Sequence, residues 1–325
     1  MDAISRVIAA VTDKQPGTEV RLDEPMKNHT SFKIGGPVRV MFFPGDAACL
    51  IGICGILGEY GVTPFFMGNG TNILAGDTAL DIAAVNTIRL NNIELTGADS
   101  LELNTKNLNL NIKNSASKNH TMITAEAGAL LSKIADFACN QGLAGFEFAH
   151  GIPGTFGGAV IMNAGAYDGE MKDVVFNTTA YNVKTGIHTV TKEEHCFSYR
   201  HSRFSNTDDV ILSSAVRLQK GDRKDIKEKM DELTARRQKS QPLDMPSAGS
   251  TFKRPKDGYA AALIEQACLN GFAVGGAAVS EKHAGFIINR GGATFKDVMT
   301  VIEHVRDVVF KRFGIELELE VKILL

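Results

Sequence analysis

Several features that would assign this chain to a common functional class are missing from its 325 residues. The formal net charge is only −2 at pH 7, so charge gives no reason to expect a nucleic acid or an anionic membrane as partner. No apolar run reaches the roughly 18 residues that a membrane-spanning helix requires. The N-terminus has no basic segment followed by an apolar one, so no secretory signal is expected. We therefore expect a globular, cytoplasmic protein with no membrane partner and no obligate protein partner.

The sequence also lacks the patterns of disulfide-linked and metal-binding proteins. Its cysteines are odd in number, scattered and without a Cys-x-x-Cys pair: Cys49, Cys54, Cys139, Cys196 and Cys268. This usage argues against a disulfide framework or a zinc site and fits a reducing compartment. The histidines show no His-Glu-x-x-His spacing, so no metal is expected.

Three frequent nucleotide and hydrolase motifs are incomplete. No Gly-Lys-Ser/Thr closes the glycine-rich segments, which excludes a P-loop. Ile73 stands where a Rossmann Gly-x-Gly-x-x-Gly would need its last glycine, so a dinucleotide bound in Rossmann fashion is not expected. Gly-x-Ser-x-Gly is absent around Ser250, so a hydrolase nucleophile elbow is not supported.

Glycine is abundant, and it is concentrated between Gly145 and Lys172. Gly151, Gly154, Gly157 and Gly158 follow one another closely, and each glycine inside a helix costs about 1 kcal/mol relative to alanine. The run is therefore predicted to be a loop whose backbone N–H groups approach a ligand such as phosphate. The alternative is a buried turn between two core elements.

A second loop of small residues, Gly68–Asp77, follows the predicted strand Pro64–Met67. Small residues after a strand again suggest approach to a phosphate, and the Thr71 hydroxyl is able to hydrogen-bond one. The alternative is an ordinary strand-to-helix turn.

Apolar periodicity predicts an α+β chain. Helices are expected at residues 2–13, 46–60, 130–141, 222–241, 259–269 and 294–313, and strands at 38–43, 64–67, 209–219, 285–289 and 316–324. Residues 174–191 are expected to form a hairpin turning at Lys184–Gly186. Residues 275–278 are expected to form a turn, and the asparagine-rich segment 104–119 is expected to be a hairpin or a mobile loop, with no function assigned to it.

Two motifs in the second half have side chains suited to chemistry. Arg200 stands between aromatic residues in the segment 197–204, where a guanidinium is able to stack and to bind a carboxylate or phosphate. Ser250 stands in an extended, exposed loop between Pro246 and Pro255. The alternatives are an arginine that caps a strand end and a plain surface turn.

A third motif is the alternating segment Glu316–Lys322 at the C-terminus. Alternation places the carboxylates of Glu316, Glu318 and Glu320 on one face of a strand. The usual interpretation of such a face is the solvated side of an edge strand.

The sequence GIPGTFGGAVIMNAGAYDGE, from Gly151, resembles the signature of the UDP-N-acetylenolpyruvoylglucosamine reductase family. NHTSFKIGGP, from Asn28, resembles the start of that family's flavin domain, and GNGTNIL, from Gly68, resembles its Gly-x-Gly-Ser-Asn-Leu-Leu loop. The resemblance extends from about residue 26 to 325. The direct passage from Leu218 into a charged helix is similar to the shorter subclass, which lacks a tyrosine-bearing insertion.

The resemblance implies roles for individual residues. Arg200 would hold the substrate's enolpyruvyl carboxylate, Ser250 would donate a proton, and Glu320 would be the catalytic glutamate, with Glu318 structural. The implied FAD contacts are Gly68, Asn69, Gly70, Thr71, Asn72, Gly151, Ile152, Pro153, Gly154, Thr155, Gly157, Gly158 and Ala159. The implied substrate contacts are Tyr199, Lys239, Gly249, Lys253, Arg254, Lys282 and His283. Arg254 departs from the asparagine that some members carry.

The implied fold is α+β: a two-subdomain FAD-binding domain of the vanillyl-alcohol-oxidase type, followed by an α/β substrate-binding domain. The expected divisions are residues 1–88, 89–219 and 220–325. FAD is expected to be non-covalent, NADPH to be the co-substrate, and a UDP-sugar to be reduced during peptidoglycan precursor synthesis. Two alternatives stay open: an FAD-dependent oxidase on the same fold, and a non-catalytic flavin- or nucleotide-binding protein.

Overall fold

The computed structural model describes residues 2–96, 101–102, 111–112, 120–256 and 258–325. The chain forms two compact units, each assembled from separate stretches of sequence. Unit 1 contains residues 1–20, 42–68 and 83–235, and unit 2 contains residues 21–41, 69–82 and 236–325. The division into three domains at residues 88 and 219 stays a prediction. Most of the asparagine-rich segment 104–119 lies outside the described residues.

The chain passes between the units mostly inside regular elements, except between residues 68 and 69. Strands β1 (Glu19–Pro25), β2 (Pro37–Phe43) and β5 (Leu80–Asn86) each contain such a passage, as does helix α6 (Arg223–Ser240). The sheet that contains these strands has the order β1–β2–β5–β3, and β3 (Phe65–Met67) runs parallel to β5. The strands predicted at 38–43 and 64–67 and the helix predicted at 222–241 are confirmed within a few residues.

An antiparallel sheet of order β14–β13–β15–β9–β6 is the centre of unit 1, and β10 (Leu143–Ala144) pairs with β15. Its strands are β6 (Ile93–Thr96), β9 (His120–Glu126), β13 (Val175–Asn182), β14 (Gly186–Thr191) and β15 (Val210–Lys220). The β13–β14 hairpin closes at the pair Asn182 and Gly186, as predicted. Gly186 has φ 76°, which glycine adopts without steric cost.

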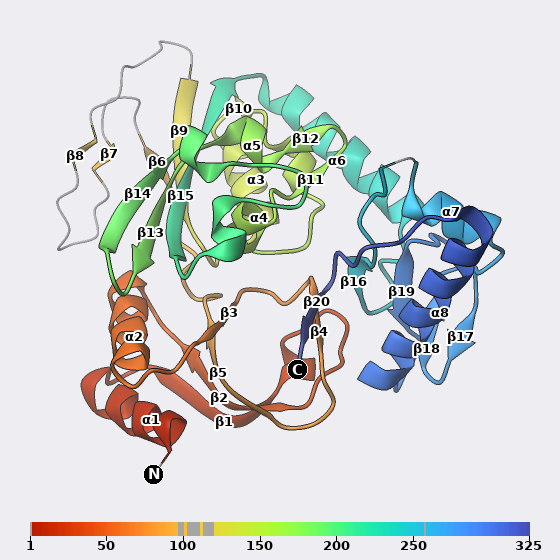
Figure 1. Ribbon diagram of the computed structural model, residues 1–325. Helices are drawn as coiled ribbons and strands as arrows, with labels where there is room; N and C mark the ends of the chain where they lie inside the picture. Colours follow the sequence, from red (N-terminus) through yellow and green to blue (C-terminus); the bar gives the residue numbers. More distant parts are fainter. Residues whose placement is uncertain (1, 97–100, 103–110, 113–119, 257) are drawn as a thin grey trace. The chain divides into compact units, whose positions relative to one another are not determined.

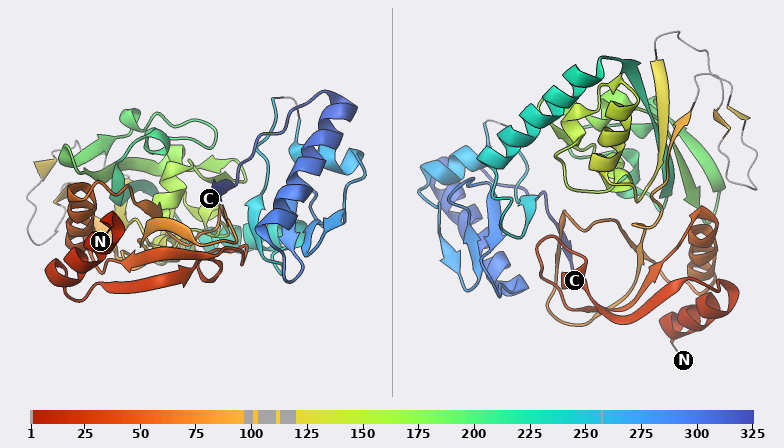
Figure 2. Two further views of the ribbon diagram at one scale, coloured as in Figure 1. Left: turned by 60° about the horizontal axis from the view of Figure 1, so that its bottom comes forward. Right: turned by 180° about the vertical axis from the view of Figure 1, so that it is seen from behind.

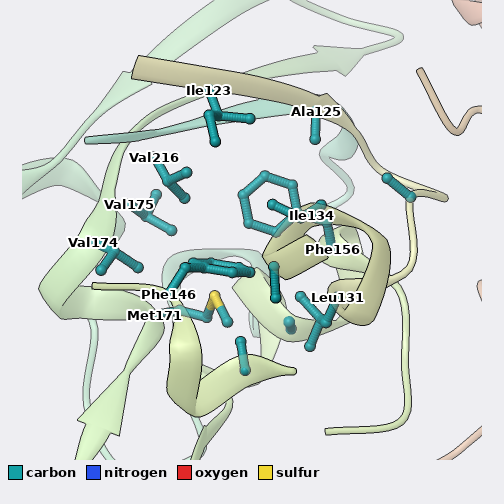
Figure 3. Close-up of a cluster of buried hydrophobic side chains, with 14 of the residues drawn as sticks. Ile123, Ala125, Leu131, Ile134, Phe146, Phe156, Met171, Val174, Val175 and Val216 are labelled. Carbon is teal, nitrogen blue, oxygen red and sulfur yellow. The ribbon is translucent and has the colours of Figure 1, made fainter. Parts of the chain in front are cut away.

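Helices α3 (Leu131–Asn140), α4 (Phe156–Ile161) and α5 (Met171–Val174) lie together beside this sheet (Figure 1). The core of unit 1 contains apolar side chains from both layers, and Phe146 and Phe156 are 1% and 0% exposed (Figure 3). Burying one such side chain contributes about 1.5–3 kcal/mol. Phe156 is the first residue of α4, so its burial fixes the place where the glycine-rich loop before it ends.

The remaining helices of unit 1 begin at aspartate caps. Helix α1 (Ala3–Lys14) is capped by Asp2, and α2 (Ala47–Glu59) is capped by Asp46. An N-cap aspartate satisfies backbone N–H groups that the first helical turn leaves without partners. The shorter elements are β7 (Leu101–Glu102), β8 (Asn111–Ile112), η2 (Glu147–Ala149), β11 (Gly165–Ala166), β12 (Gly169–Glu170), η3 (Glu193–His195) and η4 (Arg203–Asn206).

Unit 2 has its own sheet, of order β16–β19–β18–β17, with helix α8 (Phe295–Phe313) beside it (Figure 2). Its strands are β16 (Ser247–Ser250), β17 (Ala273–Val274), β18 (Ala277–Val279) and β19 (Phe286–Asn289), and α7 (Ala260–Gln266) packs on α8. Helix α8 begins at a Thr294 capping box and ends at Gly314 with φ 69°, where the sequence predicts its end. Two further elements of this unit are η1 (Met26–Asn28) and the parallel pair of β4 (Ile73–Ala75) and β20 (Lys322–Leu324).

Four local predictions are wrong. Residues 156–161 form a helix, so Gly157 and Gly158 lie in the helix α4 that the glycine count argued against. The predicted strand 316–324 is reduced to β20, Ala277 and Ala278 belong to strand β18, and residues 73–75 of the second predicted loop form strand β4. Strands β4 and β20 pair with each other across almost the whole chain, and β18 pairs with β17 and β19, so pairing partners that periodicity along one segment does not reveal decide these conformations.

Candidate active site

The glycine-rich loop (residues 151–158) is pinned to the connection between β9 and α3. Leu131 N donates to Gly154 O over 3.2 Å, and Phe156 N donates to Ala129 O over 2.8 Å. Gly157 N donates to Ala127 O over 2.8 Å. These bonds hold the loop backbone in one place, as a preformed binding surface requires.

The two adjacent glycines of this loop have different surroundings. A Cβ added to Gly157 would lie 3.0 Å from Ala127 Cβ and 3.2 Å from Ala127 O. Gly158 is exposed, and the nearest atom to an added Cβ is Thr155 Oγ1 at 3.7 Å. Glycine is thus needed at 157 because the protein itself fills the space, whereas at 158 the space outside the backbone is open.

Gly68, at the start of the second predicted loop, lies against the first. An added Cβ at this position would be 2.0 Å from Thr155 Oγ1, and the Thr155 side chain is buried. The structure therefore brings the start of one glycine-containing segment next to the middle of the other within unit 1.

Arg200 lies at the tip of a tight turn, the Arg200 turn (residues 198–201). Ser198 N donates to His201 O over 3.0 Å, and His201 N donates to Ser198 O over 3.2 Å. Arg200 has φ 54°, a left-handed conformation that is uncommon for a non-glycine residue. Its guanidinium carbon lies 5.1 Å from the centre of the Tyr199 ring, and Tyr199 is 46% exposed. The turn thus presents a cation and an aromatic ring together.

In unit 2, Ser250 and Glu320 lie on two segments that hydrogen-bond as an antiparallel ladder, the Ser250 ladder (residues 250–253 and 318–321). Glu320 N donates to Thr251 O over 2.9 Å, and Lys253 N donates to Glu318 O over 2.8 Å. Ser250 is half-buried at the end of β16, where the sequence predicts an exposed loop. Among the described residues, the Ser250 hydroxyl has no hydrogen-bond partner, so it is available to another group.

The loop 69–72 is joined to this ladder. Asn72 Nδ2 donates to Glu320 O over 3.0 Å, and Lys322 N donates to Asn72 O over 2.9 Å. Gly70 approaches His29 O so closely that an added Cβ would lie 2.0 Å from that oxygen. The second predicted loop is therefore partly a structural support for Glu320, and the cofactor contacts proposed for Asn69, Gly70, Thr71 and Asn72 stay predictions.

The predicted substrate contacts of unit 2 lie around the same ladder. Lys253 Nζ is 3.1 Å from Glu318 Oε2, and the Arg254 guanidinium lies 4.2 Å from the centre of the Tyr259 ring. Gly249 has φ 75° and nothing within 4 Å of an added Cβ. Open space here would let a substrate approach Ser250.

Two other predicted contacts, Lys282 and His283, follow strand β18. Lys282 Nζ donates to Gln238 O over 2.7 Å, at the end of α6, where Lys239 is exposed. The His283 ring packs edge-on against Phe286, the residue that pairs with Ser250. Burial lowers the pKa of His283 despite the opposing effects of a backbone hydrogen bond and Glu265, and His283 Nδ1 accepts from Gly285 N over 3.2 Å. The ring is therefore neutral, with its proton on Nε2.

The structure places the catalytic candidates in both units. Arg200 and Tyr199 belong to unit 1, and Ser250 and Glu320 belong to unit 2. Across the described residues, no group of histidine, cysteine, aspartate or glutamate side chains is arranged to hold a metal ion. The same residues contain no helix that is both long and apolar enough to cross a membrane.

Comparison with known proteins decides the family. A family model described as "FAD binding domain" matches residues 38–191, and one described as "UDP-N-acetylenolpyruvoylglucosamine reductase, C-terminal domain" matches residues 241–324. The UDP-N-acetylenolpyruvoylglucosamine reductase of Caldanaerobacter subterraneus is 46% identical over 93% of this chain and 92% of its own length. The chain belongs to the UDP-N-acetylenolpyruvoylglucosamine reductase family.

Two further relatives agree with this assignment. The reductase of Clostridium perfringens is 41% identical over 94% of this chain and 93% of its own length. The crystal structure of the reductase from Thermus caldophilus is similar with a TM-score of 0.74 and 26% identity, covering 95% of this chain and 99% of that one. The resemblance and the fold class predicted from the sequence are thereby confirmed, including the FAD-binding domain.

FAD is the cofactor of this reductase family, and the residues of unit 1 fit it. Residues 151–159 lie within the matched FAD-binding domain and contain no charged side chain. Pro153 and Gly158 are exposed, and the backbone of Gly158 faces open space. A surface of bare, pinned backbone is what a bulky cofactor with a diphosphate needs for close approach.

Sequence reasoning assigned no role to two polar residues near the Arg200 turn, Asn163 and Glu170. Asn163 and Glu170 lie in the central glycine-rich stretch, but the motif match assigned them no role. The one available signal was composition, because Glu170 is among the few charged residues of that stretch. The hydrogen bond from Asn163 to Ser198 O joins residues 35 positions apart, which no local pattern predicts.

Proposed function

We propose that this chain is an NADPH-dependent flavoenzyme that reduces UDP-N-acetylenolpyruvoylglucosamine to UDP-N-acetylmuramate, a step of peptidoglycan precursor synthesis. The observation that carries the proposal is the Ser250 ladder, which joins the segments that contain Ser250 and Glu320 inside the domain that matches this reductase family. We place the enzyme in the cytoplasm, where a UDP-sugar and NADPH are its small-molecule partners.

FAD, when bound, supplies the hydride chemistry between NADPH and the enolpyruvyl double bond. The chain's own residues have a different task, because adding hydride to one carbon of the double bond leaves negative charge on the neighbouring carbon and its carboxylate. That charge must be stabilised and then removed by a proton.

Arg200 is suited to the first part of this task. A guanidinium binds a carboxylate through two parallel N–H donors, and it stays charged at every relevant pH. The neighbouring Tyr199 ring lies within cation–π distance and restricts the guanidinium. Arg200 therefore holds the enolpyruvyl carboxylate and stabilises the enolate as it forms.

Ser250 is suited to the second part. A serine hydroxyl is a weak acid, but an enolate carbon is basic enough to take its proton when the two are held together. The hydroxyl has no competing partner within the described residues, and Gly249 leaves space beside it. The backbone of Glu320 is held in the same ladder by its hydrogen bonds to Thr251 and Asn72, and only a protonated Glu320 carboxyl is able to donate a hydrogen bond to an enolate oxygen.

The proposal is tested by oxidising NADPH with the purified protein under anaerobic conditions. The expected result is stoichiometric NADPH oxidation when the enolpyruvyl substrate is added, with UDP-N-acetylmuramate as product. In a second assay, in air and without the enolpyruvyl substrate, the protein should oxidise NADPH only slowly. Rapid oxygen-dependent turnover that ignores the enolpyruvyl substrate would establish an oxidase instead, and flavin binding without any turnover would establish a non-catalytic protein.

A further inference from the structure

Both ends of the Arg200 turn are attached to the C-terminal end of helix α4. Ser198 O accepts a hydrogen bond from Asn163 Nδ2 over 3.0 Å. On the other side of the turn, the hydroxyls of Ser202 and Ser205 donate to Ile161 O over 2.9 Å and 3.2 Å. Helix α4 begins in the glycine-rich loop, so this loop and the Arg200 turn form one connected structure within unit 1.

Asn163 is the polar centre of this connection. Its residue is 1% exposed and has φ 43°, a conformation that asparagine tolerates better than most residues. Its Nδ2 donates to Glu170 Oε2 over 2.9 Å as well as to Ser198 O, and its Oδ1 accepts from Lys172 N over 2.9 Å. The amide is therefore fully used, and it sets the position of the Glu170 carboxylate relative to the turn.

The Glu170 carboxylate receives positive charge from two directions. Lys172 Nζ lies 2.8 Å from Oε2, the same oxygen that Asn163 binds, and the Glu170 side chain also accepts from the Asp173 backbone at the start of α5. Burial opposes the charge of Glu170. Hydrogen bonds from Lys172 and Asn163, and the charges of Lys172 and Arg200, outweigh burial, so the pKa of this carboxyl lies below its usual range. Glu170 is thus ionised and within the electrostatic reach of Arg200.

We infer that Glu170 is a positioning residue: held by Asn163, its carboxylate orients the Arg200 guanidinium so that the remaining N–H donors face the substrate's carboxylate. This inference rests on the proposed function of Arg200. An arginine has five N–H donors in a rigid fork, so an anchor on one side leaves the other side for a second carboxylate. Without the anchor, a long flexible side chain at the tip of an exposed turn samples many rotamers, and substrate binding must order it.

The test is the substitution Glu170→Gln. Glutamine keeps the length of the side chain and an oxygen that accepts from Asn163 and caps α5, but it removes the charge that faces Arg200. We expect KM for the enolpyruvyl substrate to rise about fivefold to tenfold, with kcat within about threefold of wild type, because the lost interaction serves binding. FAD content and the rate of flavin reduction by NADPH should stay within about twofold.

Lys172→Met is the matched control, since it removes the other cation from the same carboxylate without touching the Arg200 turn. Its KM should stay within about twofold of wild type, and Glu170→Asp, which keeps the charge, should fall between wild type and Glu170→Gln. An unchanged KM in Glu170→Gln, or equal slowing of flavin reduction and reoxidation, would overturn the inference. If Glu170→Gln does not fold, an unchanged KM in Glu170→Asp would likewise overturn the inference. Failure of the wild-type enzyme to use the enolpyruvyl substrate would instead reject the proposed function.

Discussion

Arg200 combines an unfavourable backbone conformation with a half-buried position outside the core. A left-handed φ costs a non-glycine residue roughly 1 kcal/mol, and no core packing of the arginine itself repays that cost. The tip of the turn is held by the hydrogen bonds at Ser198 and His201 and by the attachments of the turn to α4. The conformation is therefore maintained by its surroundings, as expected where a side chain must be presented to a ligand.

We predict that Arg200→Lys is poorly tolerated. Lysine keeps the positive charge but lacks the planar fork that binds a carboxylate through two donors. Reoxidation of reduced flavin by the enolpyruvyl substrate should slow by about 10²-fold, as expected for loss of a donor that stabilises developing negative charge.

Stopped-flow measurement of the two half-reactions checks the Arg200→Lys prediction. Flavin reduction by NADPH should stay within about fivefold of wild type. A variant in which only flavin reduction is slow would contradict the role given to Arg200.

Single residues show where sequence reasoning succeeds and where it stops. The motifs that contain Ser250 and Glu320 lie far apart in the sequence, and the structure joins them in one ladder, while the catalytic roles of both residues stay predictions. Asn163 gave no such signal. Asn163 is buried and hydrogen-bonds Ser198 and Glu170, and the burial of an asparagine cannot be inferred from the residues beside it in the sequence.

At the scale of elements, two adjacent glycines at the start of helix α4 are needed for different reasons. Gly157 packs against Ala127, and Gly158 faces open space. The pair therefore forms a matched test of which glycine serves the fold and which serves FAD.

Gly157→Ala should lower the thermal unfolding midpoint of the cofactor-free protein, because overpacking against Ala127 costs about 1–3 kcal/mol. Gly158→Val should leave that midpoint nearly unchanged but weaken FAD binding at least about tenfold, because its side chain enters the space over the loop. Unfolding of the apo-protein and fluorescence titration with FAD measure both quantities. Normal FAD affinity in Gly158→Val would show that the cofactor does not approach this backbone.

His195 attaches the segment that precedes the Arg200 turn to the β13–β14 hairpin. It is 0% exposed, its Nδ1 donates to Thr191 O over 2.6 Å, and its Nε2 accepts from the Thr178 hydroxyl over 2.8 Å. Phe197 stacks on its ring at 4.7 Å. Burial, assisted by the charge of Arg203, lowers the pKa of His195 against the opposing effects of its backbone hydrogen bonds and Glu194.

These contacts predict that the protein loses stability in mild acid. The pKa of His195 and that of His283 are lower in the folded chain than in the unfolded chain, where a histidine has a pKa near 6.5. Their contribution is therefore fully present above about pH 7 and is lost as the pH falls below about 6.5, because the unfolded state then binds more protons. The thermal unfolding midpoint should therefore decrease as the pH is lowered from 7.5 to 5.5.

The substitution His195→Asn isolates this effect, since an asparagine amide is able to keep the donor to Thr191 O but does not titrate. The variant should be less stable at pH 7.5 and show a smaller decrease toward pH 5.5 than wild type, with His283 responsible for the remainder. An identical pH slope in wild type and His195→Asn would exclude His195 as a source.

At the scale of the whole molecule, the order of segments along the chain did not predict which of them form each unit. Helices such as α8 and hairpins such as β13–β14 follow from caps, turns and apolar spacing, and they were predicted within a few residues. Residues 21–41 and 69–82, however, join the C-terminal residues in unit 2. That assembly depends on pairings such as β4 with β20, which connect positions almost 250 residues apart, and a linear pattern contains no information about them.

The two units contain residues that are proposed to act in different parts of the reaction. The glycine-rich loop and the Arg200 turn belong to unit 1, and the candidate proton donor Ser250 with Glu320 belongs to unit 2. A change in the Ser250 ladder should therefore leave the first half-reaction, flavin reduction by NADPH, unchanged. The second half-reaction should need the Ser250 proton.

Single-turnover stopped flow on Ser250→Ala under anaerobic conditions tests that claim most directly. FAD content and the rate of flavin reduction by NADPH should match wild type. Reoxidation of the reduced flavin by the enolpyruvyl substrate should slow by about 10²–10⁴-fold, the usual effect of losing a general acid. Ser250→Cys should recover part of this rate because a thiol also donates a proton, whereas near-normal reoxidation in Ser250→Ala would show that water or another side chain supplies it.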